Sequence, residues 1–271
     1  MAVHNVAHRG YSAVAPENTL PALDAAVLAG ASLIEFDVRT TADGVPVVIH
    51  DRTVDRTTSG IGEVGELTWA QIHELDAGSW FSAAYAGARV PLLADVLSLL
   101  CAPRAQKPAP ERPVPPAEAP DEIADPPPAP PSPELLLEIK SPATAEQVEA
   151  ILGMVGEAGL LERTVVQSFD PDVVRLAAEA VPQVRRGLLR FDFDADQLAV
   201  AKDLGLTFCN PSINGLLSDR PTLTRLADAG VGVMPWTAND PAQWPQLIEA
   251  GVAGLITDRA GELTGWAAAR A

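Results

Sequence analysis

Cysteine, basic side chains and long apolar runs are all scarce in this chain. Only two of its 271 residues are cysteines, Cys101 and Cys209, and their wide separation fits neither a Cys-x-x-Cys motif nor a disulfide framework. A reducing compartment is therefore expected. No stretch approaches the roughly 20 apolar residues of a membrane span, and Met1–Gly10 lacks the basic and apolar regions of a secretory signal. These absences predict a cytoplasmic protein with no stable membrane anchoring.

Basic residues are outnumbered by acidic ones, 19 against 36, which gives a net charge of −17. Nucleic acids and anionic membranes are bound by basic surfaces, so we expect neither as a partner. A small phosphate-containing substrate is still compatible with this charge, because one divalent cation and two basic side chains can reverse the local potential.

Strand-like apolar runs alternate with amphipathic, helix-like segments along almost the whole chain. Eight such units in roughly 250 residues favour a (β/α)8 TIM barrel, an α/β fold, over an open doubly wound sheet. The expected strands are Asn5–His8, Ser32–Val38, Leu135–Lys140, Thr164–Ser168, Arg186–Leu189, Leu206–Asn210, Val231–Trp236 and Gly254–Thr257. The expected helices lie near Asn18–Ala29, Leu92–Leu100, Ala145–Ala158, Pro171–Ala180, Asp194–Leu204, Pro221–Ala229, Pro241–Ala250 and Ala260–Ala269.

Two segments interrupt this alternation. Thr40–Arg89, after the second strand, is a polar, Gly-rich excursion in which Val45–Ile49 is expected to form a hairpin with that strand across Asp43-Gly44. Ala102–Pro133, before the third strand, holds 13 of the 25 prolines and predicts a disordered or polyproline-like insertion. We therefore expect residues 1–271 to form a single catalytic domain that includes this flexible insertion, 102–133. Because the insertion joins a helix to the next strand, it should lie opposite the catalytic face and be dispensable for chemistry.

Polar residues capable of catalysis stand where barrel strands are expected to end. Residues two apart on a strand share a face, so two of the pairs each direct both charges to one side. Unpaired charges are rarely buried at such positions unless they bind something. The segments are His8-Arg9, Glu35 with Asp37, His50-Asp51, and Glu138 with Lys140.

Three of these residues, Glu35, Asp37 and Glu138, form a carboxylate set suited to one hard divalent cation, Ca²⁺ or Mg²⁺. Any one of them alone would more often form a salt bridge at a strand end. Three on matching strand ends beside two histidines favour a metal site. Zinc is less favoured, because no cysteine contributes and the histidines are needed elsewhere.

His8 and His50 are the candidates for proton transfer, since histidine titrates near neutral pH. The other two histidines, His4 and His73, are expected to be structural or exposed. Arg9 and Lys140 could hold phosphate oxygens, although Lys140 could also pair with a nearby acid.

Several further residues are candidates for the walls of the site. Trp236, at the end of its strand, could line the substrate pocket, although tryptophan at such a position is also often simple packing. Weaker candidates, which could serve only to satisfy backbone groups, are Asn18, Gln167, Ser168 and Asn239.

In motif order, the chain resembles the glycerophosphodiester phosphodiesterase family of single-domain bacterial type. The matching segments are Ala7-His8-Arg9-Gly10, Pro16-Glu17-Asn18-Thr19, Ile34-Glu35-Phe36-Asp37-Val38, Thr41-Ala42-Asp43-Gly44, Val47-Val48-Ile49-His50-Asp51, Arg56-Thr57-Thr58-Ser59-Gly60, Pro91-Leu92-Leu93, Leu137-Glu138-Ile139-Lys140, Gln167-Ser168-Phe169, Trp236-Thr237 and Thr257-Asp258. They extend over nearly the whole chain, and the Pro-rich insertion is the main departure from the family pattern.

The resemblance implies residue roles as well as an activity. Positions matching Glu35, Asp37 and Glu138 bind the metal in that family, those matching His8 and His50 act as general acid and base, and those matching Arg9 and Lys140 contact phosphate. The implied reaction is hydrolysis of a glycerophosphodiester to an alcohol and sn-glycerol 3-phosphate. Either histidine could be the base, attack could pass through a cyclic phosphate or come directly from water, and the headgroup, native metal and oligomeric state stay open.

Two alternatives are compatible with the same barrel. A phospholipase D-like enzyme acting on lysophospholipids would favour an exposed apolar patch, which Trp69, Trp80, Phe81 and Tyr85 could supply. A non-catalytic barrel that binds a phosphodiester or a protein partner is less favoured, because such a protein has no need of two histidines and three acids together.

Overall fold

Eight parallel strands form the centre of the molecule. The computed structural model describes residues 3–101 and 132–270, so residues 102–131 of the expected insertion lie outside the described residues. The parallel strands are β1 (His4–Ala7), β2 (Leu33–Thr40), β4 (Glu134–Ile139), β5 (Thr164–Ser168), β6 (Arg185–Arg190), β7 (Phe208–Pro211), β8 (Gly232–Val233) and β9 (Gly254–Thr257). Their order in the sheet is β8-β7-β6-β5-β4-β2-β1-β9. This is the expected α/β barrel.

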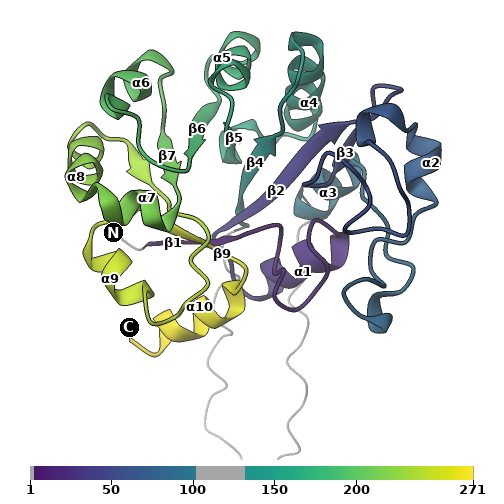
Figure 1. The fold of residues 1–271 in the computed structure, drawn as a ribbon, viewed down its shortest axis with the longest axis horizontal. Coiled ribbons are helices and arrows are strands. Elements are labelled where there is room, and N and C mark those ends of the chain that lie inside the picture. Colours follow the sequence, from purple (N-terminus) through teal and green to yellow (C-terminus); the bar gives the residue numbers. More distant parts are fainter. Residues whose placement is uncertain (1–2, 102–131, 271) are drawn as a thin grey trace, which may run out of the picture.

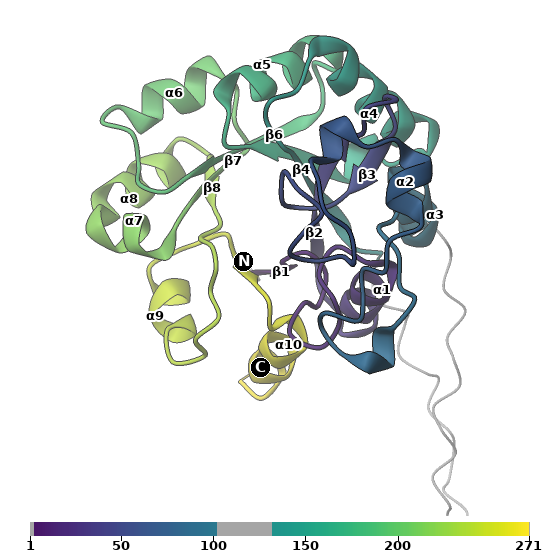
Figure 2. The same cartoon turned by 45° about the vertical axis from the view of Figure 1, so that its right-hand side comes forward.

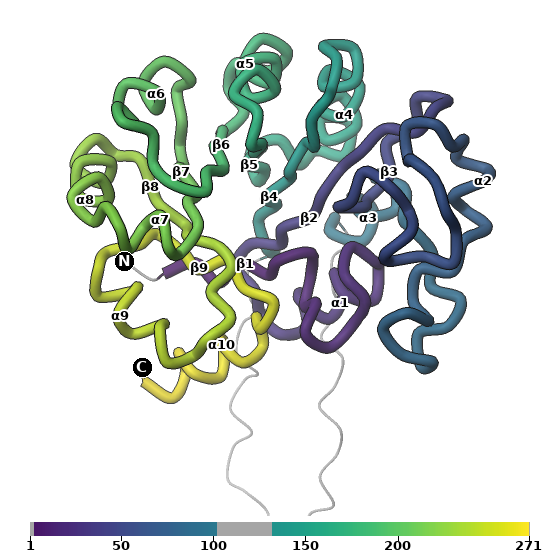
Figure 3. The backbone as a smooth tube through the Cα atoms, in the orientation of Figure 1, coloured from purple at the N-terminus to yellow at the C-terminus, as the bar shows by residue number. Residues whose placement is uncertain are grey.

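Backbone hydrogen bonds nearly close the sheet between its two ends. The N–H of Ala253 donates to the carbonyl of Val233 at 2.8 Å, and that of Ile256 to the carbonyl of Pro235 at 3.1 Å. The backbone thus makes one circuit in sequence order and returns β9 to the side of β1 (Figure 3). This closure brings His8 and Asp258, the residues just after those two strands, to the same end of the barrel.

Helices cover the outer face of the strands and form an incomplete ring around them (Figures 1 and 2). They are α1 (Leu20–Leu28), α3 (Leu93–Cys101), α4 (Ala145–Glu157), α5 (Pro171–Ala180), α6 (Gln197–Asp203), α7 (Ile213–Ser218), α8 (Arg220–Asp228), α9 (Trp244–Glu249) and α10 (Ala260–Ala268). A separate cluster fills the barrel interior with Val6, Leu33, Leu136, Val165, Phe208, Met234 and Ile256. The interior is therefore a packed core, above which the polar strand ends are exposed to a cavity.

The segment after β2 forms the expected hairpin, with β3 (Pro46–Val48) antiparallel to β2. It continues through α2 (Trp69–His73) and the short 3₁₀ helices Val64–Glu66 and Ala83–Tyr85. The excursion also has an apolar cluster of its own, which was not expected from the sequence: Val47, Ile49, Val54, Val64, Ile72, Ala77 and Val90. This small core holds the hairpin and the residues that follow it against the barrel.

One expected strand is much shorter than predicted, and two α-helices, α2 and α7, were not predicted. Only Gly232–Val233 of the expected strand Val231–Trp236 forms a continuous ladder with β7, and beyond Pro235 the N–H of Trp236 donates to the Pro211 carbonyl at 3.0 Å. Pro235 has no N–H to donate to a ladder, which limits the strand. Of the two helices, α7 begins after Ser212, whose hydroxyl accepts the N–H of Gly215.

Two further findings concern the helices and the cysteines. Among the described residues, none of the helices combines the length and the apolar content needed to cross a bilayer. Both cysteines are free, Cys101 exposed and Cys209 buried.

Candidate active site

A cavity of about 420 Å³ opens at the carboxyl ends of the strands. One wall is polar, with His8, Arg9, Glu35, His50, Glu138 and Gln167. The other is apolar, with Phe169, Leu189, Phe191, Trp236 and Ile256. In a TIM barrel this face is where active sites lie. The cavity therefore offers charged groups on one side and an apolar surface for the rest of a substrate on the other.

The three acids predicted to bind a cation lie together at the floor of this region. Glu35 and Asp37 come from β2 and Glu138 from β4, and the pairing of these strands sets Asp37 directly beside Glu138. All three side chains are buried, and each offers a carboxylate oxygen within 4.8 Å of the others. Oxygens on opposite sides of a Ca²⁺ ion lie about 5 Å apart, so this spacing suits a single ion.

The three acids are all buried, but their pKa values shift in different directions. Burial, with the charges of Asp37 and Glu138, raises the pKa of Glu35 well above its usual value. Burial and the charge of Asp37 raise the pKa of Glu138 to about 7. Burial also acts to raise the pKa of Asp37, but the charges of Lys140 and Arg9 outweigh it and lower that pKa.

A second observation supports a divalent cation at this carboxylate set. Asp37 Oδ1 is buried and accepts no hydrogen bond from the described residues, although Lys140 Nζ lies 3.2 Å away as an ion pair. The Lys140 ammonium offsets part of the cost of burying this oxygen, and a bound cation would complete its partners. Three oxygen donors with no sulfur ligand match a hard ion.

Two basic side chains and one amide surround the acids. Lys140 Nζ donates to Glu138 Oε1 at 2.6 Å, and Asn18 Nδ2 donates to Asp37 Oδ2 at 2.7 Å. The backbone N–H of Arg9 donates to Glu35 Oε2 at 2.8 Å, while its side chain lies 3.5 Å from Asp37 as an ion pair. Arg9 and Asn18 both have a φ of 56°, a left-handed conformation rarely taken by such residues. The turn after β1 thus directs several groups to one point.

His8, directly after β1, is held by a carboxylate from the other end of the chain. Its Nδ1 lies 2.6 Å from Oδ1 of Asp258, which follows β9. Asp258 also accepts hydrogen bonds from Ser12 Oγ at 3.0 Å and from Asn239 Nδ2 at 2.5 Å. An ionised carboxylate only accepts, so the ring donates through Nδ1 and its Nε2 is left for the cavity.

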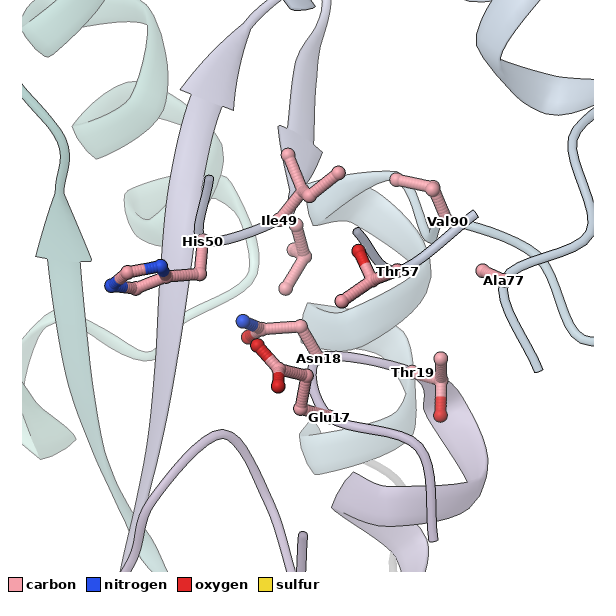
Figure 4. A pocket seen from close by; sticks show the side chains of 9 residues that line it. Glu17, Asn18, Thr19, Ile49, His50, Thr57, Ala77 and Val90 are labelled. Atoms are coloured by element: carbon pink, nitrogen blue, oxygen red, sulfur yellow. The ribbon is translucent and has the colours of Figure 1, made fainter. Parts of the chain in front are cut away.

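His50, two residues after β3, is held in the same way by its neighbour. Its Nδ1 lies 2.6 Å from Asp51 Oδ1, and burial lowers the pKa of His50. His50 also borders a void of about 10 Å³ together with Glu17, Asn18 and Thr57, but its ring points away from these three side chains (Figure 4). The contact with Asp51 therefore orients the imidazole.

The apolar wall is built on three aromatic rings. Phe169, Phe191 and Trp236 pack against one another with ring centroids 5.3–5.5 Å apart. Trp236 Nε1 donates to the carbonyl of Asn210 at 2.8 Å, which fixes the orientation of the indole. Phe191 is 66% exposed, so the wall reaches the mouth of the cavity.

The structure brings together the residues that the sequence singled out. The main candidates that line the cavity are His8, Arg9, Glu35, His50, Glu138 and Trp236. The other two are Asp37 and Lys140, and Lys140 forms ion pairs with both Asp37 and Glu138. Among the weaker candidates, Asn18 and Asn239 bond to Asp37 and Asp258, and Gln167 lines the cavity, whereas Ser168 only bonds to the Ile139 carbonyl.

Residue-level reasoning did not assign roles to three charged residues that support the site. These are Glu17, Arg56 and Asp258, which lie in loops. The only signal in the sequence was their presence in the family-like segments.

Comparisons with known proteins point to the family that the sequence motifs resemble. The model of the glycerophosphoryl diester phosphodiesterase family matches residues 8–119 and 132–262. The chain is similar to the glycerophosphodiester phosphodiesterase of Caldanaerobacter subterraneus subsp. tengcongensis, with 31% identity over 255 residues that cover 93% of each protein. It is also similar to the solved structure of glycerophosphodiester phosphodiesterase from Agrobacterium tumefaciens strain C58, at a TM-score of 0.75 and 26% identity, covering 97% of this chain and 100% of that one. In fold it matches a phosphodiesterase from Oleispira antarctica, at a TM-score of 0.77 and 23% identity, covering 96% and 94%.

Proposed function

The chain belongs to the glycerophosphoryl diester phosphodiesterase family, and from this we propose that it hydrolyses glycerophosphodiesters to an alcohol and sn-glycerol 3-phosphate. The observation that carries the proposal is the meeting of three buried carboxylates and two carboxylate-held histidines at one cavity. The Oleispira antarctica phosphodiesterase, which shares the fold, was solved in complex with the product sn-glycerol-3-phosphate.

Glu35, Asp37 and Glu138 would hold one divalent cation, Ca²⁺ or Mg²⁺. When bound, such an ion supplies positive charge that lowers the pKa of a nearby hydroxyl and offsets the negative charge that develops on the phosphate. Arg9 and Lys140, beside these acids, are the groups proposed to hold phosphate oxygens. Both basic side chains stay charged, because the neighbouring carboxylates raise the pKa of Arg9 and that of Lys140 against the effect of burial.

His8 and His50 are the proposed proton-transfer pair. One Nε2 takes the proton from the attacking hydroxyl as the new P–O bond forms. The other gives a proton to the leaving alcohol oxygen as its P–O bond breaks. The hydrogen bonds from Nδ1 to Asp258 and to Asp51 hold each ring and fix its tautomer. The same two histidines can serve attack by the glycerol 2-hydroxyl or direct attack by water.

The direct test is release of glycerol 3-phosphate from a panel of glycerophosphodiesters. We expect turnover that is lost with a chelator and restored by Ca²⁺ or Mg²⁺ added singly. A fully active chelated enzyme would remove the cation from the proposal, and no release from any diester would refute the proposed reaction. A cytoplasmic location remains a prediction.

A lysophospholipid substrate is the second candidate, and two exposed aromatic residues favour it. Phe191 at the cavity mouth is 66% exposed and Trp80 is 41% exposed. Such side chains could contact an acyl chain outside the cavity. The ratio of glycerophosphocholine turnover to lysophosphatidylcholine turnover separates the two substrates. Similarity to phosphodiesterases argues against the third alternative, a non-catalytic barrel.

A further inference from the structure

Arg56 makes an unusually complete set of ion-pair hydrogen bonds beside the cavity. Its Nε and Nη2 donate to Oδ2 and Oδ1 of Asp51 at 2.6 and 3.0 Å. Its Nη1 and Nη2 donate to Oε2 and Oε1 of Glu17 at 2.8 and 2.7 Å. One guanidinium therefore grips two carboxylates, each through both oxygens.

Each of these carboxylates also holds a residue of the cavity wall. Asp51 Oδ1 is the partner of His50 Nδ1 at 2.6 Å, and Glu17 Oε1 accepts from Arg9 Nη1 at 2.7 Å. The result is a continuous chain of contacts from His50 to Arg9, with Arg56 at its centre. It joins the turn after β1 to the loop after β3, which have no strand pairing between them.

The geometry points to Arg56 as a positioning residue that sets the relative placement of His50 and Arg9 for the phosphodiester reaction. This assignment rests on the proposed function, in which those two residues transfer a proton and hold phosphate. Arg56 itself does not line the cavity. It acts through the two acids.

The chemistry requires arginine at this position. A planar guanidinium can donate in parallel to two carboxylates, whereas the single ammonium of lysine cannot span both. Among the described residues, the side-chain hydrogen bond that holds the His50 ring is the one to Asp51, the carboxylate that Arg56 grips. His8 offers a contrast: its carboxylate, Asp258, is held by the neutral donors Ser12 and Asn239. Arg56 should therefore affect His50 and leave His8 unchanged.

Kinetics of substituted enzymes test this role. Arg56→Ala is expected to lower kcat/KM for glycerophosphocholine roughly 10²-fold, the size of effect typical of a misplaced catalytic group. Both kcat and KM should change, because His50 and Arg9 lose support together. Arg56→Lys should be almost as impaired, although it keeps the charge. Arg52→Ala and Arg52→Lys are the matched controls, since the Arg52 side chain is 72% exposed and, among the described residues, its ion pair is with Glu63; their kinetics should match the wild type.

Two further measurements separate positioning from general loss of structure. Guanidinium ion at low, non-denaturing concentration should restore part of the activity of Arg56→Ala, and ammonium ion should not. The chain has only four histidines, so ¹⁵N spectra of the rings can follow each one. In the wild type His50 should be the Nδ1–H tautomer, and Arg56→Ala should give a mixture of tautomers with the His8 signals unchanged.

Wild-type kcat/KM in a folded Arg56→Ala or Arg56→Lys enzyme, or an unaltered His50 tautomer, would overturn the assignment. If Arg56→Ala does not fold, Arg56→Lys provides the same comparison. A wild-type enzyme that cleaves no diester would refute the proposed function, while the histidine spectra would still decide whether Arg56 orients His50.

Discussion

Glu35, Asp37 and Glu138 are equally buried but differ in the number of donors that face them. Asp37 is contacted by Lys140, Arg9 and Asn18, and the charges of Lys140 and Arg9 lower its pKa. Among the described residues, the side chain of Glu35 accepts a hydrogen bond from one donor, the backbone N–H of Arg9. The protein alone therefore supplies too little positive charge to ionise all three near neutral pH, and a cation would make up the difference.

Metal removal is expected to destabilise the enzyme more at pH 8 than at pH 5. The pKa of Glu138 rises from 4.5 to about 7 on folding. A group with a raised pKa in the folded state stabilises the fold below pH 4.5, and this contribution is lost as the pH rises through about 7. Cation binding needs deprotonated carboxylates, so it replaces the lost contribution at high pH. Thermal unfolding should show that Ca²⁺ or Mg²⁺ raises Tm by a few degrees at pH 8 and by less at pH 5.

Glu35→Gln is the matched variant for this measurement, because it removes one charge and keeps the side-chain shape. Without metal at pH 8 it should unfold at a higher temperature than the wild type, and it should lose most of the cation-dependent increase. Equal cation-dependent increases in the two proteins would place the ion elsewhere.

The two histidines are expected to be individually essential. His8→Ala or His50→Ala should lower kcat by about 10²–10⁴-fold, since each removes one proton transfer. Thermal unfolding should change little, because both rings lie at the partly exposed cavity wall. Steady-state assays of glycerophosphocholine hydrolysis measure the effect, with His73→Ala on α2 as the control. Near-normal kcat in either variant would exclude that histidine from the reaction.

The reacting side chains could be predicted from sequence because they stand next to apolar runs that identify strand ends. Glu138 follows Leu135–Leu137, and His8 follows a run in β1. Asp258 and Glu17 could not be assigned in the same way. Their roles depend on loops that meet only when the barrel closes, and Asp258 lies 250 residues from His8. Local pattern carries no information about such pairings.

At the scale of elements, the turn from β1 to α1 is the most constrained connection of the site. Gly10 has a φ of +82°, and a Cβ there would lie 2.6 Å from the backbone carbon of Ala22 in α1. No side chain fits without moving α1 or the turn. Because Arg9 precedes this glycine, the same movement would displace the Arg9 contacts with Glu35 and Glu17.

Gly10→Ala is therefore expected to cost about 1–3 kcal/mol of stability and to reduce activity as well. Gly44→Ala is the control: Gly44 has a φ of +81°, but no atom lies within 4 Å of the added Cβ. It should show the smaller cost of the backbone conformation alone, with normal activity. Urea unfolding and diester hydrolysis measure both variants. Equal losses of stability would show that the close approach to α1 is not limiting.

The prediction of helices and strands succeeded where an apolar pattern extends over many residues and failed where the helix or strand is short. The eight strands and the long helices α4 and α5 follow directly from apolar patterns. β8 was overestimated because the apolar run continues past the last ladder pair into Pro235. α7 has only six residues, and its one clear signal is the cap at Ser212. Short elements of this kind are set by tertiary contacts more than by local preference.

At the scale of the whole molecule, the candidate site lies at one end of the barrel and the residues that flank 102–131 lie at the other, so the two ends have separate roles. Glu138 at the carboxyl end of β4 lines the cavity, whereas Glu134 begins the same strand about 13 Å away. The described residues on either side of 102–131 are anchored at that far end. Cys101 Sγ donates to the Ala158 carbonyl at 3.1 Å, and the N–H of Glu134 donates to the Ser32 carbonyl at 2.9 Å.

Replacing residues 102–131 with a short Gly/Ser linker is therefore expected to leave the site and the fold intact. Each flank keeps its own hydrogen bonds, and none of the cavity residues belongs to either flank. Shortening a connection several-fold reduces its closure entropy by only about 1 kcal/mol, so stability should hold or rise slightly. We expect kcat/KM within about twofold of the wild type and an unchanged Tm, and the same for a variant with these residues in shuffled order. If the linker variant folds but loses most of its activity while the shuffled variant keeps it, the length of this connection matters for chemistry at the opposite end. If both lose activity, its specific sequence matters, and the separation of tasks between the two ends would be wrong.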